Sequence, residues 1–400
     1  MDEIGNAINR IWGRLSKLRK GITVDLDVDL KHRKMGNLTI LLAYGSNLFE
    51  FPGSKKSKPS GFTNTLGFNK PALSGNGPIF EGSTIMYQRD LSQNHLLDDH
   101  ILFQFIADNE FYTTRACLEV WKELRKLEKD LGSSPLRISG LYAGFQREDG
   151  RNWLGFHDGL SNLKSSERPQ VIFIDPRSVM ADEKWSALGT YLIFMRIVLD
   201  LKTWEDLHPT VQQIVIGRDK LTGCPLIGID RNKKPLKDSR CPVPGTSEVT
   251  DPGNEYFRDH RPYGSTMADR ILQYSHIGST RPIDRIPLSD KKSRRIYRQG
   301  FEFLVSSKYP PGFIAGLNFV SFQNTPQRFF RSLNYQQMIT KKNALMEIGR
   351  TLEQFMSVTA AGIFFVPAMT QGEPFPGAQV FFNTSEIKDL SQLTKGPRKG

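Results

Sequence analysis

The sequence predicts an α+β protein built from two similar halves, and three observations lead to this prediction. Amphipathic stretches of helical period alternate with short apolar stretches of strand length along the 400 residues. Segments rich in Gly and Pro separate them, as connections in a folded chain do. With 38% apolar and 24% charged residues, the composition is globular and excludes a collagen-like or largely disordered chain.

The first half carries two predicted helices. In residues 4–20, apolar side chains recur at steps of three and four, which places them on one helix face. Residues 111–131 carry a second stripe, and Gly132 follows as a stop signal. Strands are predicted at 37–44, 85–88, 101–107 and 140–146. The order of a strand, a helix and a second strand, with further strands before them, is typical of an antiparallel, ferredoxin-like α+β unit.

The same pattern recurs after a loop at about 147–169. Strands are predicted at 170–174, 190–199, 315–322 and 361–366, and helices at about 202–214 and 326–356. A Pro- and Gly-rich excursion at 216–263 is too long for a simple connector. We therefore predict two ferredoxin-like halves with antiparallel sheets and packed helices. They span 1–150, which includes the N-terminal amphipathic helix, and 151–400.

The charge is strongly basic, because 54 Lys and Arg against 42 Asp and Glu give a net charge of +12. Such an excess can attract nucleic acid, an acidic membrane surface or anionic substrates. Here it lies in short patches without the interleaved aromatic residues of a single-strand binding platform. The patches favour a solvated basic surface, so no nucleic-acid partner is expected. A basic nucleic-acid-binding protein remains an alternative.

The location of the protein is predicted from what the ends and the apolar stretches contain. The longest apolar stretches fall far short of the ~18 residues needed to cross a bilayer, which excludes a membrane span. Three cysteines without a C-x-x-C spacing argue against a disulfide framework and a zinc or iron–sulfur site. The N-terminus carries no apolar signal segment. We expect a cytoplasmic protein, unless a leader has been removed.

Two segments could carry chemistry. In Gly155-Phe156-His157-Asp158-Gly159, a glycine on each side lets the backbone approach a ligand while presenting one carboxylate, although Asp-Gly is also a common turn. His157 and Asp158 could alternatively form a metal pair. His276 precedes a cationic segment, 294–300. A lone histidine is usually structural, but a haem needs only one protein nitrogen as axial ligand.

The order of these segments resembles that of the dye-decolourising (DyP-type) haem peroxidases. Residues 155–159 match the G-x-x-D-G loop of that family, and Ser275-His276-Ile277 is similar to the segment with its proximal ligand. Arg298-Gln299-Gly300 resembles the stretch with the distal arginine, and 316–319 resembles a later strand. The resemblance extends, with gaps, over about residues 37–370.

The resemblance implies a dimeric α+β barrel-like architecture that binds haem b (iron protoporphyrin IX) mainly in the second half. It implies His276 as the axial iron ligand, Asp158 as the distal proton shuttle and Arg298 as the distal arginine. The remaining residues that it assigns are Leu317 and Phe319, which would line the peroxide pocket, and Arg281, a propionate partner. The partners would be hydrogen peroxide and an organic reductant, and the protein could form a homo-oligomer.

The sequence departs from the family pattern at two places. The position that usually holds an acidic partner of the proximal histidine holds Asn343, and Glu347 follows one turn later. Arg294 and Arg295 compete with Arg298 for the distal role, because an insertion at 283–293 shifts the alignment. The leading hypothesis is a peroxidase that oxidises a dye or phenolic donor. The alternative on the same fold is a haem-handling protein with weak peroxidase activity.

Overall fold

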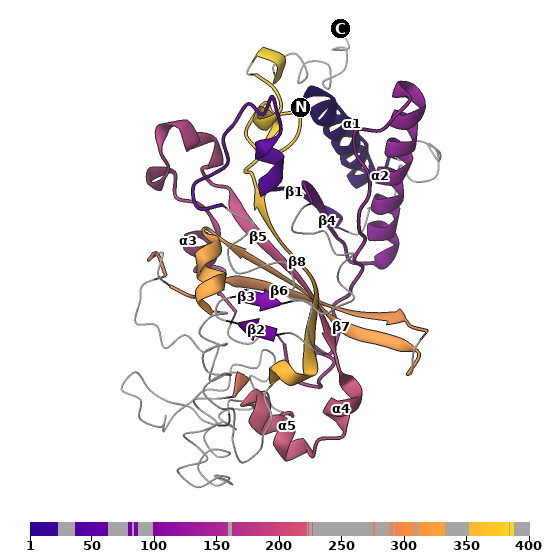
Figure 1. The fold of residues 1–400 in the computed structure, drawn as a ribbon, viewed down its shortest axis with the longest axis vertical. Helices are drawn as coiled ribbons and strands as arrows, with labels where there is room; N and C mark the ends of the chain where they lie inside the picture. Colours follow the sequence, from indigo (N-terminus) through magenta and orange to yellow (C-terminus); the bar gives the residue numbers. More distant parts are fainter. Residues whose placement is uncertain are drawn as a thin grey trace.

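The computed structural model describes residues 1–22, 37–62, 79–81, 84–86, 99–158, 162–221, 223, 226, 275–276, 288–290, 293–308, 311–332, 352–383 and 385–387. Its centre is a six-stranded antiparallel sheet in the order β4–β1–β8–β5–β7–β6 (Figure 1). The strands of this sheet are β1 (Thr39–Gly45), β4 (Ile101–Ile106), β5 (Thr190–Leu199), β6 (Tyr297–Ser306), β7 (Phe313–Gln323) and β8 (Met356–Val366). The curled antiparallel sheet with packed helices confirms the α+β class.

The remaining regular elements lie around this sheet. A separate two-stranded sheet consists of β2 (Ile79–Glu81) and β3 (Thr84–Met86). The α-helices are α1 (Asp2–Arg19), α2 (Glu110–Leu131), α3 (Arg168–Ile172), α4 (Leu201–Glu205) and α5 (Pro209–Ile216). Among the residues that the structure describes, no helix is long and apolar enough to cross a lipid bilayer.

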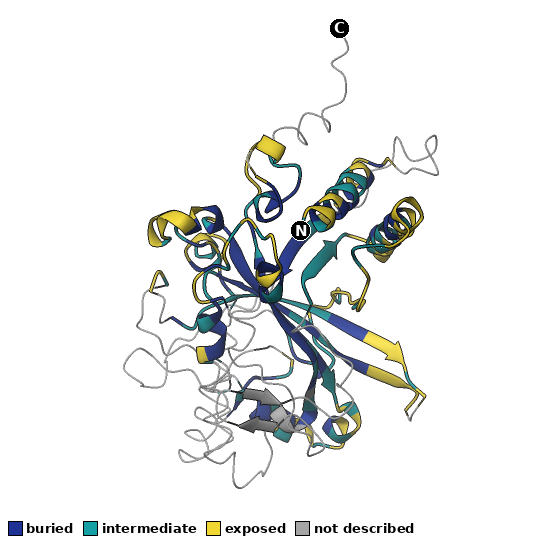
Figure 2. Cartoon of the chain, turned by 45° about the horizontal axis from the view of Figure 1, so that its top comes forward, coloured by how far each residue is buried: buried dark blue, intermediate teal, exposed yellow. Residues whose placement is uncertain are grey.

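Helices α1 and α2 lie side by side against β1 and β4 (Figure 1). The side chain of Asn109 caps α2 by accepting a hydrogen bond from the Phe111 N–H at 2.8 Å, and Gly132 ends the helix with φ 78°. Ala7, Ile11 and other residues of the α1 stripe are buried against the stripe of α2. The outer faces of both helices are exposed (Figure 2). The structure therefore confirms both helices predicted from the amphipathic periods.

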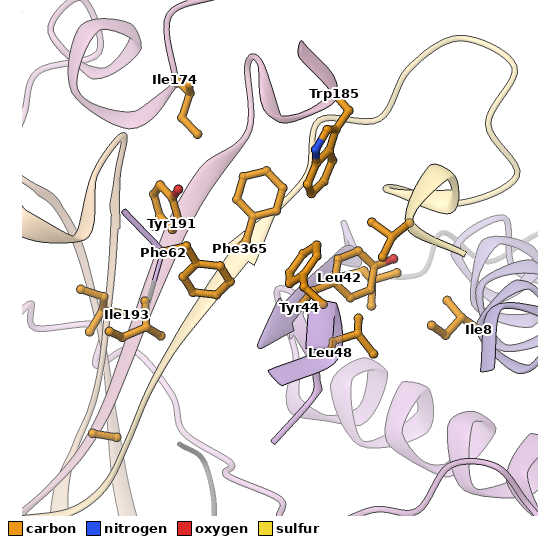
Figure 3. Packing of buried hydrophobic residues seen from close by; sticks show 14 of the residues in the cluster. Ile8, Leu42, Tyr44, Leu48, Phe62, Ile174, Trp185, Tyr191, Ile193 and Phe365 are labelled. Carbon is orange, nitrogen blue, oxygen red and sulfur yellow. The ribbon is translucent and has the colours of Figure 1, made fainter. Parts of the chain in front are cut away.

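The largest apolar cluster joins the two predicted halves. It combines Ile8 of α1, Tyr44 of β1 and Phe365 of β8 with the segment 375–382. Figure 3 shows the ring of Phe365 lying between aromatic and aliphatic neighbours from several elements. Strand β1 also pairs with β8, so strands from both halves form one sheet.

Four local expectations differ from the structure. Residues 170–174 are expected as a strand, but α3 extends through Ile172, because Pro169 lies in its first turn, where the fixed φ of proline favours a helix. Residues 140–146 form no strand beyond a single bridge from Phe145. The expected helix at 202–214 is divided into α4 and α5, since Pro209 cannot donate a backbone hydrogen bond to a preceding turn. Strand β6 was not expected, because its sequence reads as a cationic segment.

Candidate functional site

Strands β6 and β7 bring several of the predicted site residues to one face of the sheet. The pairs Arg298–Ser321, Gly300–Phe319 and Glu302–Leu317 lie directly opposite each other. Opposed residues in an antiparallel pair point to the same face, and every second residue along a strand does so as well. The side chains of Arg298, Leu317 and Phe319 therefore share a face with Gly300 between them.

The carboxylate of Asp158 lies directly over Gly300. A Cβ atom at residue 300 would stand 2.7 Å from Asp158 Oδ2 and 3.1 Å from Leu317 Cδ1. Real Cβ atoms do not approach oxygen this closely, so any side chain at this position would displace the carboxylate. The missing side chain of Gly300 is therefore what lets Asp158 reach the sheet beside Arg298.

The loop that carries Asp158 is held in a tight hairpin. The Asp158 N–H donates to Gly150 O at 2.8 Å, and the Asn152 N–H donates to Phe156 O at 2.9 Å. Gly155 has φ 84°, a left-handed conformation that glycine adopts without strain. Phe156 is buried beneath the loop with its ring 6.3 Å from that of Trp204. The aspartate is thus presented by a fixed backbone.

Asn162 ties this loop to the strand that carries Arg298. Its Nδ2 donates to Arg298 O at 2.7 Å, and its Oδ1 accepts from the Arg298 N–H at 3.1 Å. Both backbone groups of Arg298 are therefore bonded by one side chain, four residues beyond Asp158. This pair of bonds fixes the position of Arg298 relative to the loop.

The charges of the site are coupled. Burial lowers the pKa of the Arg298 guanidinium, the nearby carboxylate of Asp158 raises it, and Arg295 lowers it. Glu302, one pair further along β6, is buried, and its pKa is raised to about 7 by burial and by the charge of Asp158. Asp158 therefore interacts with a cation on one side and with a second carboxyl group on the other.

His276 lies within reach of the same charges. Burial lowers the pKa of its imidazole to about 4, and the positive charges of Arg298 and Arg218 act in the same direction. At neutral pH the ring is uncharged and keeps a nitrogen lone pair that can bind a metal. The structure thus brings Asp158, Arg298 and His276 into one electrostatic neighbourhood.

The other predicted site residues have different outcomes. Arg281, Asn343 and Glu347 lie outside the described residues. Arg294 and Arg295 precede β6, and Arg295 Nη2 lies 3.7 Å from Glu167 Oε2. Within the described ranges, no group of three or more His, Cys, Asp or Glu side chains could hold a metal ion.

Sequence reasoning missed two features of this site. Neither Glu302 nor Asn162 is among the site residues predicted from the sequence. The signal for Glu302 was the period-two spacing of Arg298, Gly300 and Glu302, which places all three on one face of a strand. This spacing is informative only in a strand, and the charged residues of 294–300 do not show the apolar alternation that predicts one.

Known proteins share this fold and this sequence pattern. A family model described as "Dyp-type peroxidase, C-terminal" matches residues 149–371. A deferrochelatase from Yersinia pestis is 20% identical over 338 residues, which cover 82% of this chain and 63% of the relative. A dye-decolorizing peroxidase from Mycobacterium tuberculosis is 31% identical over 130 residues, covering 32% of this chain and 36% of that protein.

Solved structures give the same result for the fold. Ferric DtpA from Streptomyces lividans has a TM-score of 0.60 at 22% identity, covering 94% of this chain and 87% of that one. A DyP-type peroxidase from Cellulomonas bogoriensis has a TM-score of 0.61 at 17% identity, covering 96% and 90%. The family model matches more than half of the chain and spans Asp158, His276 and Arg298. The chain therefore belongs to the DyP-type peroxidase family.

Proposed function

We propose that the chain is a haem-dependent peroxidase that reduces hydrogen peroxide and oxidises an organic donor of the dye or phenolic type. The observation that carries this proposal is the position of the Asp158 carboxylate over Gly300, beside Arg298. Leu317 and Phe319 share the same face of the sheet. A carboxylate and a guanidinium next to apolar side chains suit proton transfer at a small, neutral oxidant.

The described residues fit haem b as the cofactor. The neutral imidazole of His276 is a suitable axial ligand, because a protonated ring could not bind iron. Arg281 is proposed as the partner of a haem propionate, since arginine pairs well with carboxylates. When bound, haem b would supply the redox chemistry, because its iron and porphyrin together can provide the two electrons that reduce the peroxide.

The residues of the chain supply proton movement and charge stabilisation. An Oδ atom of Asp158 takes the proton from the inner oxygen of the peroxide and returns it to the outer oxygen, which leaves as water. The guanidinium of Arg298 stabilises negative charge on the departing oxygen, which is worth a few kcal/mol for one donor of this kind. Leu317 and Phe319 limit the access of water and of bulky donors.

The cofactor is tested with purified protein and hemin. Wild-type protein should bind hemin with a Soret band that changes on addition of peroxide. His276→Ala should lose the ligand-field features of that spectrum, whereas His208→Ala should keep them, because His208 lies at the exposed start of α5. A wild-type protein that binds no hemin would contradict the proposal.

A haem-handling protein is the second candidate function. The observation that favours it is the match to a relative named deferrochelatase over 82% of this chain. Asp158→Asn and Arg298→Leu separate the two candidates, with Asp175→Asn, an exposed aspartate paired with Arg177, as control. Retained hemin with peroxidase turnover lowered about 10²-fold or more supports the peroxidase. Unchanged turnover supports haem handling.

A further inference from the structure

Glu302 is a buried carboxyl group that the proton transfer described above does not use. Its residue is 4% exposed, and its Oε2 atom has no hydrogen-bond partner among the described residues. A buried polar atom without a partner costs free energy, so native proteins keep few of them. Glu302 lies on the same face of β6 as Arg298 and Gly300. It is two residues beyond Gly300, the residue over which the Asp158 carboxylate lies.

The segment that leads into the Asp158 loop covers Glu302. Phe145 exchanges both backbone hydrogen bonds with Glu302, at 2.8 and 2.7 Å, and the Trp153 indole donates to Phe303 O at 3.0 Å. Since β6 is the edge strand of the sheet, this segment pairs with its open side at the position of Glu302. Opposite it on β7 stands Leu317, which brings no charge.

The charged groups around Glu302 favour its neutral form. Asp158 brings a negative charge, while Arg147 and a backbone hydrogen bond from Trp153 favour the carboxylate more weakly. Arg147 is engaged elsewhere, because its Nη2 lies 2.6 Å from Asp149 Oδ2. Burial and Asp158 together raise the pKa of Glu302 to about 7. The group can therefore change charge in the neutral range.

We propose that Glu302 is a positioning acid of the distal site that controls the pH dependence of peroxide reduction through Asp158. As a neutral acid, it adds no negative charge to that of Asp158 near Arg298. Once ionised, Glu302 adds a second negative charge on the same face. This charge strengthens the hold of Asp158 on the proton taken from peroxide and so opposes its return to the outer oxygen. The proposal rests on the peroxidase function and adds a residue to it.

The first measurement is kcat/KM for hydrogen peroxide from pH 5 to 9 with haem-loaded full-length protein. The wild-type kcat/KM should fall about tenfold as the pH rises through neutral. This fall corresponds to a coupling of about one pKa unit between Glu302 and Asp158. Glu302→Gln should remove this step and keep the value of the acid limb. Glu302→Asp keeps a titrating group and should restore a step.

The second measurement does not require turnover. In the infrared spectrum of the haem-free protein, a carboxylic-acid band should lose intensity through about pH 7. The band should be absent in Glu302→Gln. The matched control is Glu183→Gln, since Glu183 is also buried but accepts a hydrogen bond from the Ser60 N–H at 3.1 Å. This control should retain both the band and the pH step.

The outcomes separate the two proposals. A haem-loaded Glu302→Gln variant with the wild-type pH profile would overturn the role of Glu302 while leaving the peroxidase intact. A carboxylic-acid band that persists in Glu302→Gln would do the same. Wild-type protein without peroxidase turnover would overturn the proposed function, and the infrared titration would still report the protonation of Glu302.

Discussion

At the scale of single residues, the distal site depends on an absent side chain and on one amide. Asp158 can lie over the sheet because residue 300 is glycine, and Arg298 is held by both functional ends of the Asn162 side chain. Neither Gly300 nor Asn162 is proposed to touch peroxide. Both fix the distance between the carboxylate and the guanidinium, on which proton transfer depends.

Gly300→Ala tests the first of these constraints. The new methyl group would stand 2.7 Å from Asp158 Oδ2, so the carboxylate must move away from Arg298. We expect kcat/KM for peroxide to fall by up to about 100-fold with hemin binding retained, because a misplacement of about 1 Å costs that much. Gly13→Ala is the control, since no atom lies within 4 Å of a Cβ there. Equal activity of the two variants would contradict the steric argument.

Asn162→Ala tests the second constraint. The substitution removes two hydrogen bonds, of 2.7 and 3.1 Å, to the backbone of Arg298. Unfolding free energy should drop by about 1–3 kcal/mol, and kcat should drop as well. Asn324→Ala also loses two bonds, to Gln170 O and from Arg328 Nε, but lies outside the site. It should lose stability and keep kcat, so a parallel loss of kcat in both variants would argue against a positioning role.

At the scale of elements, sequence predicted what depends on local periodicity. The stripes of α1 and α2 and the continuous apolar run of β5 define their elements without help from the rest of the fold. Strand β6 lacks such a run, because its inward positions carry Arg298, Gly300 and Glu302. Functional side chains replaced the apolar pattern, so the strand and Glu302 were missed together.

Residues 140–146 show the opposite failure. Their apolar residues suggested a strand, yet only Phe145 pairs with β6, and Leu141 remains 69% exposed. This segment crosses the edge of the sheet rather than joining it. Asp158 and Arg298, by contrast, could be named as candidates from the sequence, because glycines flank the one and the order of motifs resembling a known family points to the other. The placement of the Asp158 carboxylate over Gly300, on the face of β6 that carries Arg298, could only be seen in the structure.

The interface of α1 and α2 carries a buried ion cluster whose cost can be measured. The Glu119 side chain is 1% exposed and pairs with Arg14, with Arg115 at 2.6 Å and with Lys122 at 3.7 Å. Removing one partner of a buried cluster leaves the other charges uncompensated.

Glu119→Ala should therefore lower the free energy of unfolding by about 3–5 kcal/mol. Glu128→Ala removes a half-exposed partner of Arg125 on the same helix and should cost less than about 1 kcal/mol. Denaturant titrations of both variants measure the difference. If the two losses were similar, the cluster would contribute no more than a surface ion pair.

At the scale of the whole molecule, the segment 375–382 packs on the N-terminal helix α1. A Cβ at Gly5 of α1 would lie 2.7 Å from Phe381 Cβ, and the Phe381 ring stands 5.6 Å from that of Tyr44 in β1. The Tyr44 hydroxyl donates to Pro376 O at 2.6 Å. The predicted halves, 1–150 and 151–400, therefore share one apolar cluster, and this arrangement has a consequence for cooperativity.

We expect the chain to unfold in a single transition rather than half by half, because a shared core couples the stability of the elements around it. Phe381→Ala should cost about 3–5 kcal/mol, since the residue is fully buried. Hydrogen exchange should then show an equal loss of protection in β4 and β7, which belong to different halves. Leu304 is half exposed on β6, so Leu304→Ala should change the protection of neither strand by more than about 0.5 kcal/mol. Protection that falls in β4 but persists in β7 would mean that the halves are separate folding units.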